Sequence, residues 1–210
     1  MNLLISGALN IKNVKNGESP EWMKKALIAA GLRPISALVD ITNYLNIAEC
    51  RPLHVFDADK LTGNITVRQA KDGEKLQALD DKEYTLSGEV AVIADEKAAQ
   101  SIAGVMGGVN TAVSAETKNV FLESAYFIPS AIATAGVKTN ALSDSRSRFE
   151  RGIDPMSTIS DNARATQMIL DICGGEASQI VVAGKEPSLE ATINFDFNEV
   201  KRLTGMDIPK

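Results

Sequence analysis

The pattern of apolar and polar residues first predicts a helix over about residues 19–31. Ser19 can cap its start, Pro20 suits the first helical position, and Gly31 can end it. Glu21 places a negative charge at the positive end of the helix dipole. The apolar positions recur at helical spacing at Met23, Ala26, Leu27 and Ala30.

Strand patterns dominate the middle of the chain. Residues 74–86 alternate around Asp80 and Asp81 in the manner of a hairpin, and residues 90–94 form a short apolar run that is typical of a buried strand. The same reasoning predicts strands at residues 65–68, 120–125 and 180–183.

Helical patterns return in the second half. One helix is predicted from about Pro129 to Ala135, and the longest one begins at Asp154 and Pro155 and reaches Cys173. Two segments stay open. Residues 35–44 could form a short helix or a strand, and the polar residues 138–151 show no period of either kind.

Many strands with helices mostly at the two ends predict an α+β fold, because a parallel sheet would require strands and helices to alternate. Residues 187–210 differ from the rest: they predict one strand (191–197) and one short helix (198–203). Such a pair cannot bury its own apolar faces. We therefore expect one domain over residues 1–186 and the start of a following domain over 187–210.

Composition removes several classes of function. The chain has 210 residues, of which 44% are hydrophobic and 23% charged, and no apolar run approaches the length of a membrane span or a signal peptide. One histidine and two distant cysteines, Cys50 and Cys173, make a zinc site unexpected. The cysteines are predicted to be reduced packing residues of a cytoplasmic protein.

Net charge limits how the chain could meet nucleic acid. At −5 and a pI near 5.0, it lacks the excess of basic residues that drives binding to phosphates. If it contacts RNA, another part of an assembly must supply most of the binding. The densest basic cluster, residues 143–152, could meet phosphate, although interleaved acidic residues make local salt bridges the more common interpretation.

Two further features could carry chemistry. The glycine-rich residues 103–108 could bring backbone amides close to a ligand or simply form a tight turn, and they match neither a P-loop nor GxGxxG. His54, the single histidine, could act as a base or bind a substrate, or could be structural. Since no GxSxG segment is present, covalent hydrolysis is disfavoured.

Glu123 interrupts an apolar strand. On an exposed face, strand alternation would explain it and nothing would follow. On an inward face, with Phe121 and Ala125 as its neighbours, the carboxylate would be buried and would need a partner. A hydroxyl group would suit it, but alternation alone does not choose the face.

Five segments, in this order, resemble the β subunit of bacterial phenylalanyl-tRNA synthetase, and the likeness covers about residues 10–186. The segments are Ser19-Pro20-Glu21-Trp22 with Gly31-Leu32-Arg33-Pro34-Ile35; Val39-Asp40-Ile41-Thr42-Asn43-Tyr44; Pro52-Leu53-His54-Val55-Phe56-Asp57; Ala103-Gly104-Val105-Met106-Gly107-Gly108 with Leu122-Glu123-Ser124-Ala125; and Arg148-Phe149-Glu150-Arg151-Gly152-Ile153-Asp154-Pro155.

The resemblance implies the B3/B4 editing module, a three-layer sheet-sheet-helix sandwich that hydrolyses tyrosine wrongly attached to tRNA(Phe). It implies a water nucleophile and no cofactor in this chain, because ATP and Mg²⁺ serve the synthetic site in the α subunit. The implied partners are the acceptor end of tRNA(Phe) and the α subunit of an α2β2 assembly. The implied compartment is the cytoplasm, with no membrane contact.

The resemblance also assigns residues. Glu123 falls where the family reads the tyrosine hydroxyl, and His54 falls near the ester; both are predicted to be catalytic. The other positions are predicted to bind substrate: Thr42, Asn43, Pro52, Ala103, Gly104, Ser143 and Ser145.

Departures from the family pattern keep a second interpretation open. The family usually has Thr-Asp-Ala-Ser where this chain has Ser143-Asp144-Ser145-Arg146, and Val55 stands where alanine is common. Arg146 would add charge and bulk if it faced the pocket. The alternative is a module that has lost editing and serves only in assembly or tRNA docking; a stand-alone deacylase is less well supported.

Overall fold

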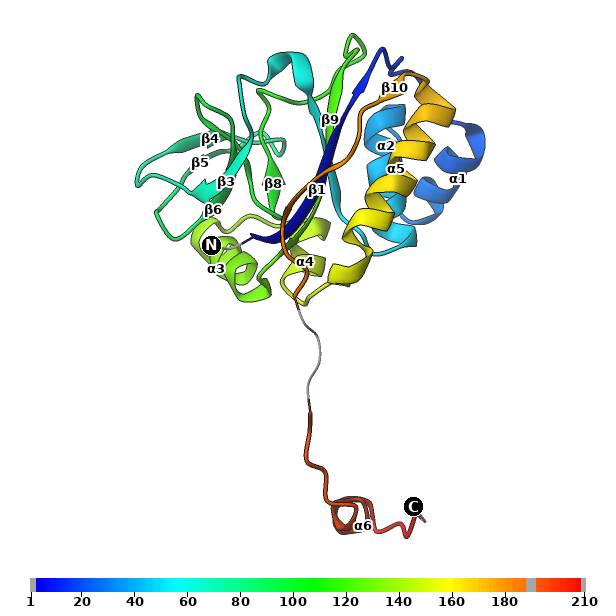
Figure 1. Cartoon of the computed structure of the whole chain (residues 1–210), viewed down its shortest axis with the longest axis vertical. Coiled ribbons are helices and arrows are strands. Elements are labelled where there is room, and N and C mark those ends of the chain that lie inside the picture. Colours follow the sequence, from blue (N-terminus) through cyan, green and yellow to red (C-terminus); the bar gives the residue numbers. More distant parts are fainter. Residues whose placement is uncertain (1–2, 188–191, 209–210) are drawn as a thin grey trace.

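A computed structural model describes residues 3–187 and 192–208, and its centre is a mixed array of strands flanked by helices (Figure 1). The main sheet has the order β10-β1-β9-β2, with β11 also paired to β1, and each of these pairs is antiparallel. Its strands are β1 (Leu3–Lys12), β2 (Leu53–Asp57), β9 (Val120–Phe127), β10 (Glu176–Ala177) and β11 (Val181–Gly184).

A second, smaller sheet has the order β3-β6-β7-β8, and a separate hairpin joins β4 to β5. The turn of that hairpin includes Asp81 with a positive φ of 63°, so the predicted hairpin at 74–86 is confirmed. The strands are β3 (Thr66–Gln69), β4 (Lys75–Gln77), β5 (Glu83–Thr85), β6 (Ala91–Ala94), β7 (Ala99–Ile102) and β8 (Met106–Gly107).

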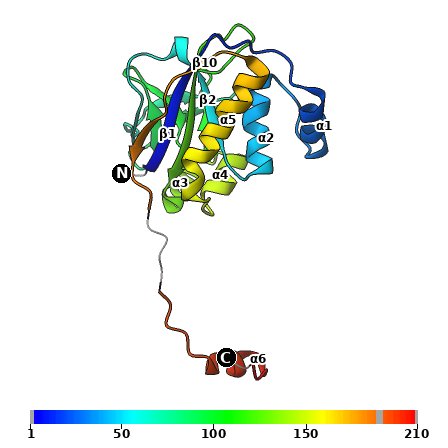
Figure 2. The same cartoon turned by 45° about the vertical axis from the view of Figure 1, so that its right-hand side comes forward.

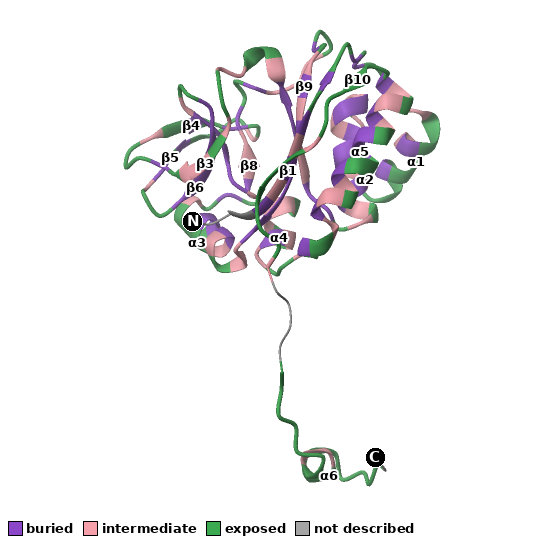
Figure 3. Ribbon diagram, viewed as in Figure 1, coloured by how far each residue is buried: buried purple, intermediate pink, exposed green. Residues whose placement is uncertain are grey.

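Helices α2 (Ala37–Ala48) and α5 (Thr158–Cys173) cover one face of the main sheet, and α1 (Glu21–Ala29) packs against α2 on its outer side (Figures 1 and 2). Val120 and Leu122 of β9 pack with Leu45 of α2 and Ile169 of α5 in this layer. Alternate residues of the same strand, Ala125 among them, pack with the second sheet in another core. Both faces of β9 are therefore buried, as Figure 3 shows, and the predicted α+β, three-layer sheet-sheet-helix arrangement is confirmed.

Two short helices, α3 (Pro129–Thr139) and α4 (Asp144–Phe149), lie at one end of the two sheets (Figure 1). Ile132 and Phe149 from them enter the core between the sheets. The Phe149 ring meets that of Phe127 edge-on, with the centroids 5.2 Å apart. Two 3₁₀ turns, η1 (Ala58–Lys60) and η2 (Pro155–Ser157), complete the regular structure of the main body.

The helices and strands predicted from strong local patterns are present. For three other segments, the sequence did not predict the secondary structure that is observed. Residues 35–44 contribute to a helix, α2, whose start Asp40 secures by accepting hydrogen bonds from Ile35 N (2.8 Å) and Ser19 Oγ (2.5 Å). The polar residues 138–151 contain α4, which is too short to show a period. Strand β1 was not predicted, although it lies at the centre of the main sheet.

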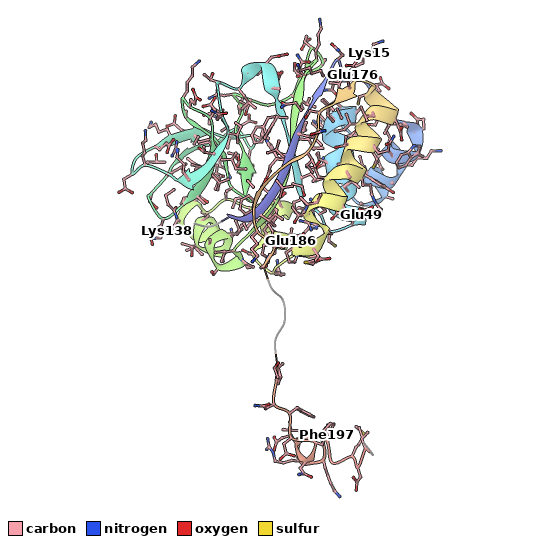
Figure 4. The ribbon with its side chains drawn as sticks, viewed as in Figure 1. Lys15, Glu49, Lys138, Glu176, Glu186 and Phe197 are labelled. Carbon is pink, nitrogen blue, oxygen red and sulfur yellow. The ribbon has the colours of Figure 1, made fainter. Side chains whose placement is uncertain are left out.

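The strand predicted at 191–197 is wrong over its described residues. Residue 191 lies outside the described residues, and residues 192–197 form no strand. Ile193, Phe195 and Phe197 alternate as in a strand, but they are exposed, and no described strand pairs with this segment to satisfy its backbone. The helix predicted beside it is confirmed as α6 (Asn198–Thr204), and Figure 4 shows Phe197 next to it, apart from the main body.

The two cysteines differ. Cys173 is buried at the end of α5, as predicted for a packing residue, whereas Cys50 is exposed, so its predicted packing role is wrong. Cys50 follows α2 with a φ of 54°, in the turn that redirects the chain into β2, and this turn faces solvent. Over residues 3–187 and 192–208, no helix is both long and apolar enough to cross a bilayer.

Candidate functional site

Glu123 occupies the middle of the main sheet on the face toward the second sheet. It stands directly opposite His54 of β2 on one side and Ala8 of β1 on the other. The residue is 8% exposed, and within the described part of the chain no group donates a hydrogen bond to its carboxylate. Burial raises the pKa of this carboxyl to about 7, and the positive charge of Arg51 offsets part of the rise.

His54 lies beside Glu123 on the same face, since directly opposed residues of paired strands have Cβ atoms about 4.5–5.5 Å apart. Its imidazole packs edge-on against the ring of Phe56, with centroids 4.2 Å apart. Burial lowers the pKa of His54 to about 4. The imidazole is therefore neutral near pH 7, with one nitrogen free to accept a hydrogen bond and the other to donate one.

A cavity of about 60 Å³ opens between these two side chains and the second sheet. It is large enough for a few water molecules and smaller than the roughly 150 Å³ that holds a benzene ring, so an aromatic side chain requires its walls to move. Five of the predicted site residues line it together: Pro52, His54, Gly104, Glu123 and Ser145.

Two glycines shape this cavity, Gly104 in the turn between β7 and β8 and Gly107 in β8. Gly104 has a φ of +67°, and a Cβ there would stand 2.8 Å from Ile132 Cδ1, so the tight turn requires glycine. Gly107 has ordinary backbone geometry, but a Cβ would stand 2.6 Å from His54 Cε1. Gly107 was not predicted as a site residue; its place in the glycine-rich segment was the available signal.

The other four predicted substrate-binding residues do not line this cavity. Thr42 and Asn43 lie on α2, where the buried Thr42 hydroxyl donates to Val39 O at 2.8 Å. Ala103 is fully buried next to Gly104. Ser143 caps α4 by accepting from Arg146 N at 3.0 Å, and its hydroxyl donates to Val105 O at 2.5 Å.

The departures from the family pattern have different consequences. Ser145 does line the cavity, so its hydroxyl adds a polar group there. Arg146 does not; it packs over Gly136 of α3 and pairs with Glu150 at 3.0 Å, so a local salt bridge of the kind predicted for this cluster is present. Val55 belongs to the core on the helix side of the sheet and leaves the cavity unchanged.

Arg51 is an important residue that the sequence did not single out. It is 1% exposed, and its guanidinium pairs with Asp161 of α5 at 2.9 Å. It also donates to the carbonyl oxygen of Ala125 on β9, to that of Asp154 and to the Ser157 hydroxyl. One side chain thus joins the start of β2, strand β9 and the segment that leads into α5, and these carry or flank the cavity.

The raised pKa of Glu123 predicts a pH-dependent stability. An unfolded Glu titrates near 4.5, so between pH 4.5 and 7 the folded chain holds a proton that the unfolded chain has lost, and stability falls as pH rises through this window. Glu123→Gln removes the titration. When the pH is raised from about 4 to about 8, we expect the free energy of unfolding of the variant to increase by about 3 kcal/mol relative to that of the wild type. Urea unfolding at the two pH values measures this. An equal difference at both pH values would contradict this.

In the part of the chain that the structure describes, no three His, Cys, Asp or Glu side chains gather where they could hold a metal ion.

Comparison with known proteins places this geometry in a family. The family model for the B3/4 domain matches residues 6–174, which include every predicted site residue. The chain belongs to the B3/4 domain family. Within it, the chain is 55% identical to the phenylalanine–tRNA ligase beta subunit of Ruegeria pomeroyi over 207 residues, and 51% identical to that of Paramagnetospirillum magneticum over 205.

These B3/4 relatives are much longer. The matches cover 99% and 98% of this chain but 26% of each relative, so the chain spans about a quarter of their length. Among solved structures, an N-terminal fragment of the phenylalanyl-tRNA synthetase beta subunit from Pyrococcus horikoshii is similar, with a TM-score of 0.48 and 14% identity, covering 97% of this chain and 56% of that one. That similarity is too low to serve as further evidence for the fold described above.

Proposed function

We propose that this B3/4 chain is the editing module of a phenylalanine–tRNA ligase beta subunit and hydrolyses tyrosine wrongly attached to tRNA(Phe). The observation that supports it most is the Glu123 carboxyl, which is buried beside His54 at a cavity and has no hydrogen-bond donor among the described residues. A buried acceptor without a partner is costly, and a ligand that supplies a donor removes the cost.

Editing of tyrosine requires a group that recognises the tyrosine hydroxyl. An apolar pocket rejects an added hydroxyl by only about 10²-fold, so the synthetic site of such an enzyme passes some tyrosine. At Glu123 the preference reverses: the tyrosine hydroxyl donates to the carboxylate, and phenylalanine leaves it unpaired. A hydrogen bond to a charged group contributes about 1.5–3 kcal/mol, enough for roughly 10- to 100-fold discrimination.

On the ester side, we propose that a water molecule is the nucleophile. His54 is neutral at pH 7, because burial lowers its pKa to about 4, and it can hold that water by accepting a hydrogen bond. Ser145 adds a hydroxyl to the same cavity wall. The acceptor end of the tRNA, the α subunit and a following domain that begins near residue 187 all belong to this proposal.

The test is deacylation of Tyr-tRNA(Phe) by the assembled synthetase, wild type against Gly107→Ala. The added methyl group would stand 2.6 Å from His54 Cε1, which is closer than van der Waals contact allows, and would displace the imidazole. Because a shift of about 1 Å in a reacting group can cost 10²-fold, we expect a loss of tenfold or more in kcat/KM. Gly17→Ala is the matched control, since a Cβ at Gly17 meets nothing within 4 Å.

The competing function is a module that only assembles with the synthetase or docks tRNA. One observation favours it: the cavity of about 60 Å³ does not admit an aromatic ring without movement of its walls. If wild-type synthetase fails to release tyrosine faster than phenylalanine from tRNA(Phe), the editing proposal is wrong and this alternative replaces it.

A further inference from the structure

We propose that a groove beside helix α4 binds the phosphodiester backbone of the tRNA acceptor end through Arg148 and Arg151. This arginine groove has a volume of about 390 Å³ and lies between the turn after α2, helix α4 and the segment that leads into α5. Its site is for phosphate, and Glu123 does not line it. The identity of the RNA rests on the proposed function, whereas phosphate binding can be measured without hydrolysis.

Arg148 and Arg151 have donors to spare for a ligand. Arg148 donates to Asp144 O at 3.2 Å and has no acidic partner among the described residues. Arg151 donates to Ser147 O at 2.5 Å and lies 3.6 Å from Glu150, a carboxylate that is already held by another arginine. A guanidinium has five N–H donors in a fork that fits the oxygens of a phosphate. Both side chains therefore keep several donors free.

The other charged residues of the groove are engaged within the protein. Arg51 is 1% exposed and pairs with a carboxylate of α5, and Glu49 pairs with Arg164. The Asp154 carboxylate caps η2 through its hydrogen bond from Met156 N. With those two ion pairs set aside, the positive charges of the two free arginines face the single negative charge of Asp154. The groove therefore favours an anionic ligand, in a chain whose net charge is −5.

The groove lies next to the cavity that Glu123 and His54 line, on a different side of α4. Ser145 of α4 lines the cavity, whereas Arg148 of the same helix lines the groove. The chain also connects the two directly, because Arg51 lines the groove and Pro52 lines the cavity. A helix with its side chains is about 10–12 Å across, which sets the scale of the separation. A nucleotide chain whose terminal ester enters the cavity therefore brings its preceding phosphates to the groove.

An acidic segment of a partner protein is the competing ligand, since carboxylates also fit a guanidinium fork. Protein interfaces obtain much of their affinity from buried aromatic anchors, and none of the described residues that line the groove is aromatic. A single RNA strand needs only positive side chains along the path of its phosphates. The composition of the groove and its place beside the cavity therefore favour RNA.

The first test is the salt dependence of Tyr-tRNA(Phe) hydrolysis by the assembled synthetase. Binding of a single strand weakens with salt concentration to the power of about 0.7 for each phosphate neutralised, so one contact contributes about a 2.6-fold drop in kcat/KM over a fourfold rise in salt. We expect Arg148→Gln and Arg151→Gln to lower kcat/KM at low salt and to lose about this factor from its salt dependence. A purely structural role for either arginine would leave that dependence unchanged.

Two further variants are controls for the charge and its position. Arg148→Lys keeps the positive charge and should retain the wild-type salt dependence, although a lysine lacks the guanidinium fork. Arg202→Gln removes the same charge from α6, where the side chain is 66% exposed, and should change neither kcat/KM nor its salt dependence.

Cys50 reports on the groove without any hydrolysis, because its side chain is exposed and lines the groove. Cys173 is buried, and burial raises its pKa to about 11, so iodoacetamide near pH 8 should alkylate Cys50 alone. In the 210-residue chain at low salt, a short single-stranded RNA should slow this alkylation severalfold. Inorganic phosphate at the same phosphate concentration should not, because only linked phosphates bind both arginines together. Arg148→Gln should weaken the protection.

The proposal is overturned if both glutamine variants keep the wild-type salt dependence, or if RNA leaves the alkylation of Cys50 unchanged. An acidic peptide that protects Cys50 better than RNA would assign the groove to a protein partner and would also overturn it. The two proposals fail separately. If Tyr-tRNA(Phe) is not hydrolysed, the editing function is wrong and protection of Cys50 still decides the groove. If it is hydrolysed and Cys50 is not protected, editing stands and the groove does not.

Discussion

Glu123→Ala is expected to lower kcat/KM for hydrolysis of Tyr-tRNA(Phe) by about 10- to 100-fold in the assembled synthetase, with little change for Phe-tRNA(Phe). The loss corresponds to one hydrogen bond between the tyrosine hydroxyl and a buried charged acceptor. Phenylalanine makes no such bond, so removing the carboxyl costs it nothing and relieves the unpaired group. The measurement is the ratio of the two deacylation rates.

Glu123→Gln is the control that separates charge from hydrogen bonding. Its amide oxygen still accepts a hydrogen bond, but a neutral one, so we expect an intermediate loss. In wild type the preference for tyrosine should rise as pH increases through about 7, where the carboxyl ionises, because the raised pKa of Glu123 lies there. The Gln variant should show no such rise. Equal rates for all three proteins would remove Glu123 from the mechanism.

Arg51→Ala is expected to destabilise the folded chain by about 3–5 kcal/mol. The substitution leaves Asp161 without its partner in a largely buried position and takes donors from the carbonyl oxygen of Ala125 and the Ser157 hydroxyl. Removing one member of a buried ion pair has this large effect because the remaining charge stays desolvated. The free energy of unfolding in urea measures it.

Arg164→Ala on the same helix, α5, provides the comparison. Arg164 pairs with Glu49, but its side chain is 62% exposed, and Figure 4 shows Glu49 at the edge of the molecule beside α5. An exposed pair of this kind contributes about 0–1 kcal/mol, so we expect a small change. If the two substitutions destabilise equally, the Arg51 network does not join the strands and α5 as the hydrogen bonds indicate.

Much of the fold could be read from local signals. The helix at 21–29, the hairpin at 75–85 and the long helix ending at Cys173 each carry their own period and their own start and stop residues. Helix α4 carries no such signal, because six residues make fewer than two turns. The alternating residues 192–197 show the converse: a strand pattern forms no strand without a partner to complete its hydrogen bonds.

Some residues of the site could be identified from the sequence and others could not, because only some of them carry a local signal. Glu123, His54 and the glycine-rich turn stand out in the sequence, as an acid in an apolar strand, a single histidine and a run of small residues. Arg51 does not stand out, since its partners lie 74 to 110 positions away. Gly107 became a site residue only when the turn brought it against His54.

By itself the sequence determined that a carboxyl sits within an apolar strand, and it left open which face that carboxyl occupies. Alternation could not decide, because both faces of β9 are buried and each carries a polar residue, Glu123 on one and Ser124 on the other. Only the tertiary structure decided: helices α2 and α5 cover the face of Leu122, and the second sheet covers the face of Glu123. Its burial between two sheets, next to His54, follows from packing of distant segments.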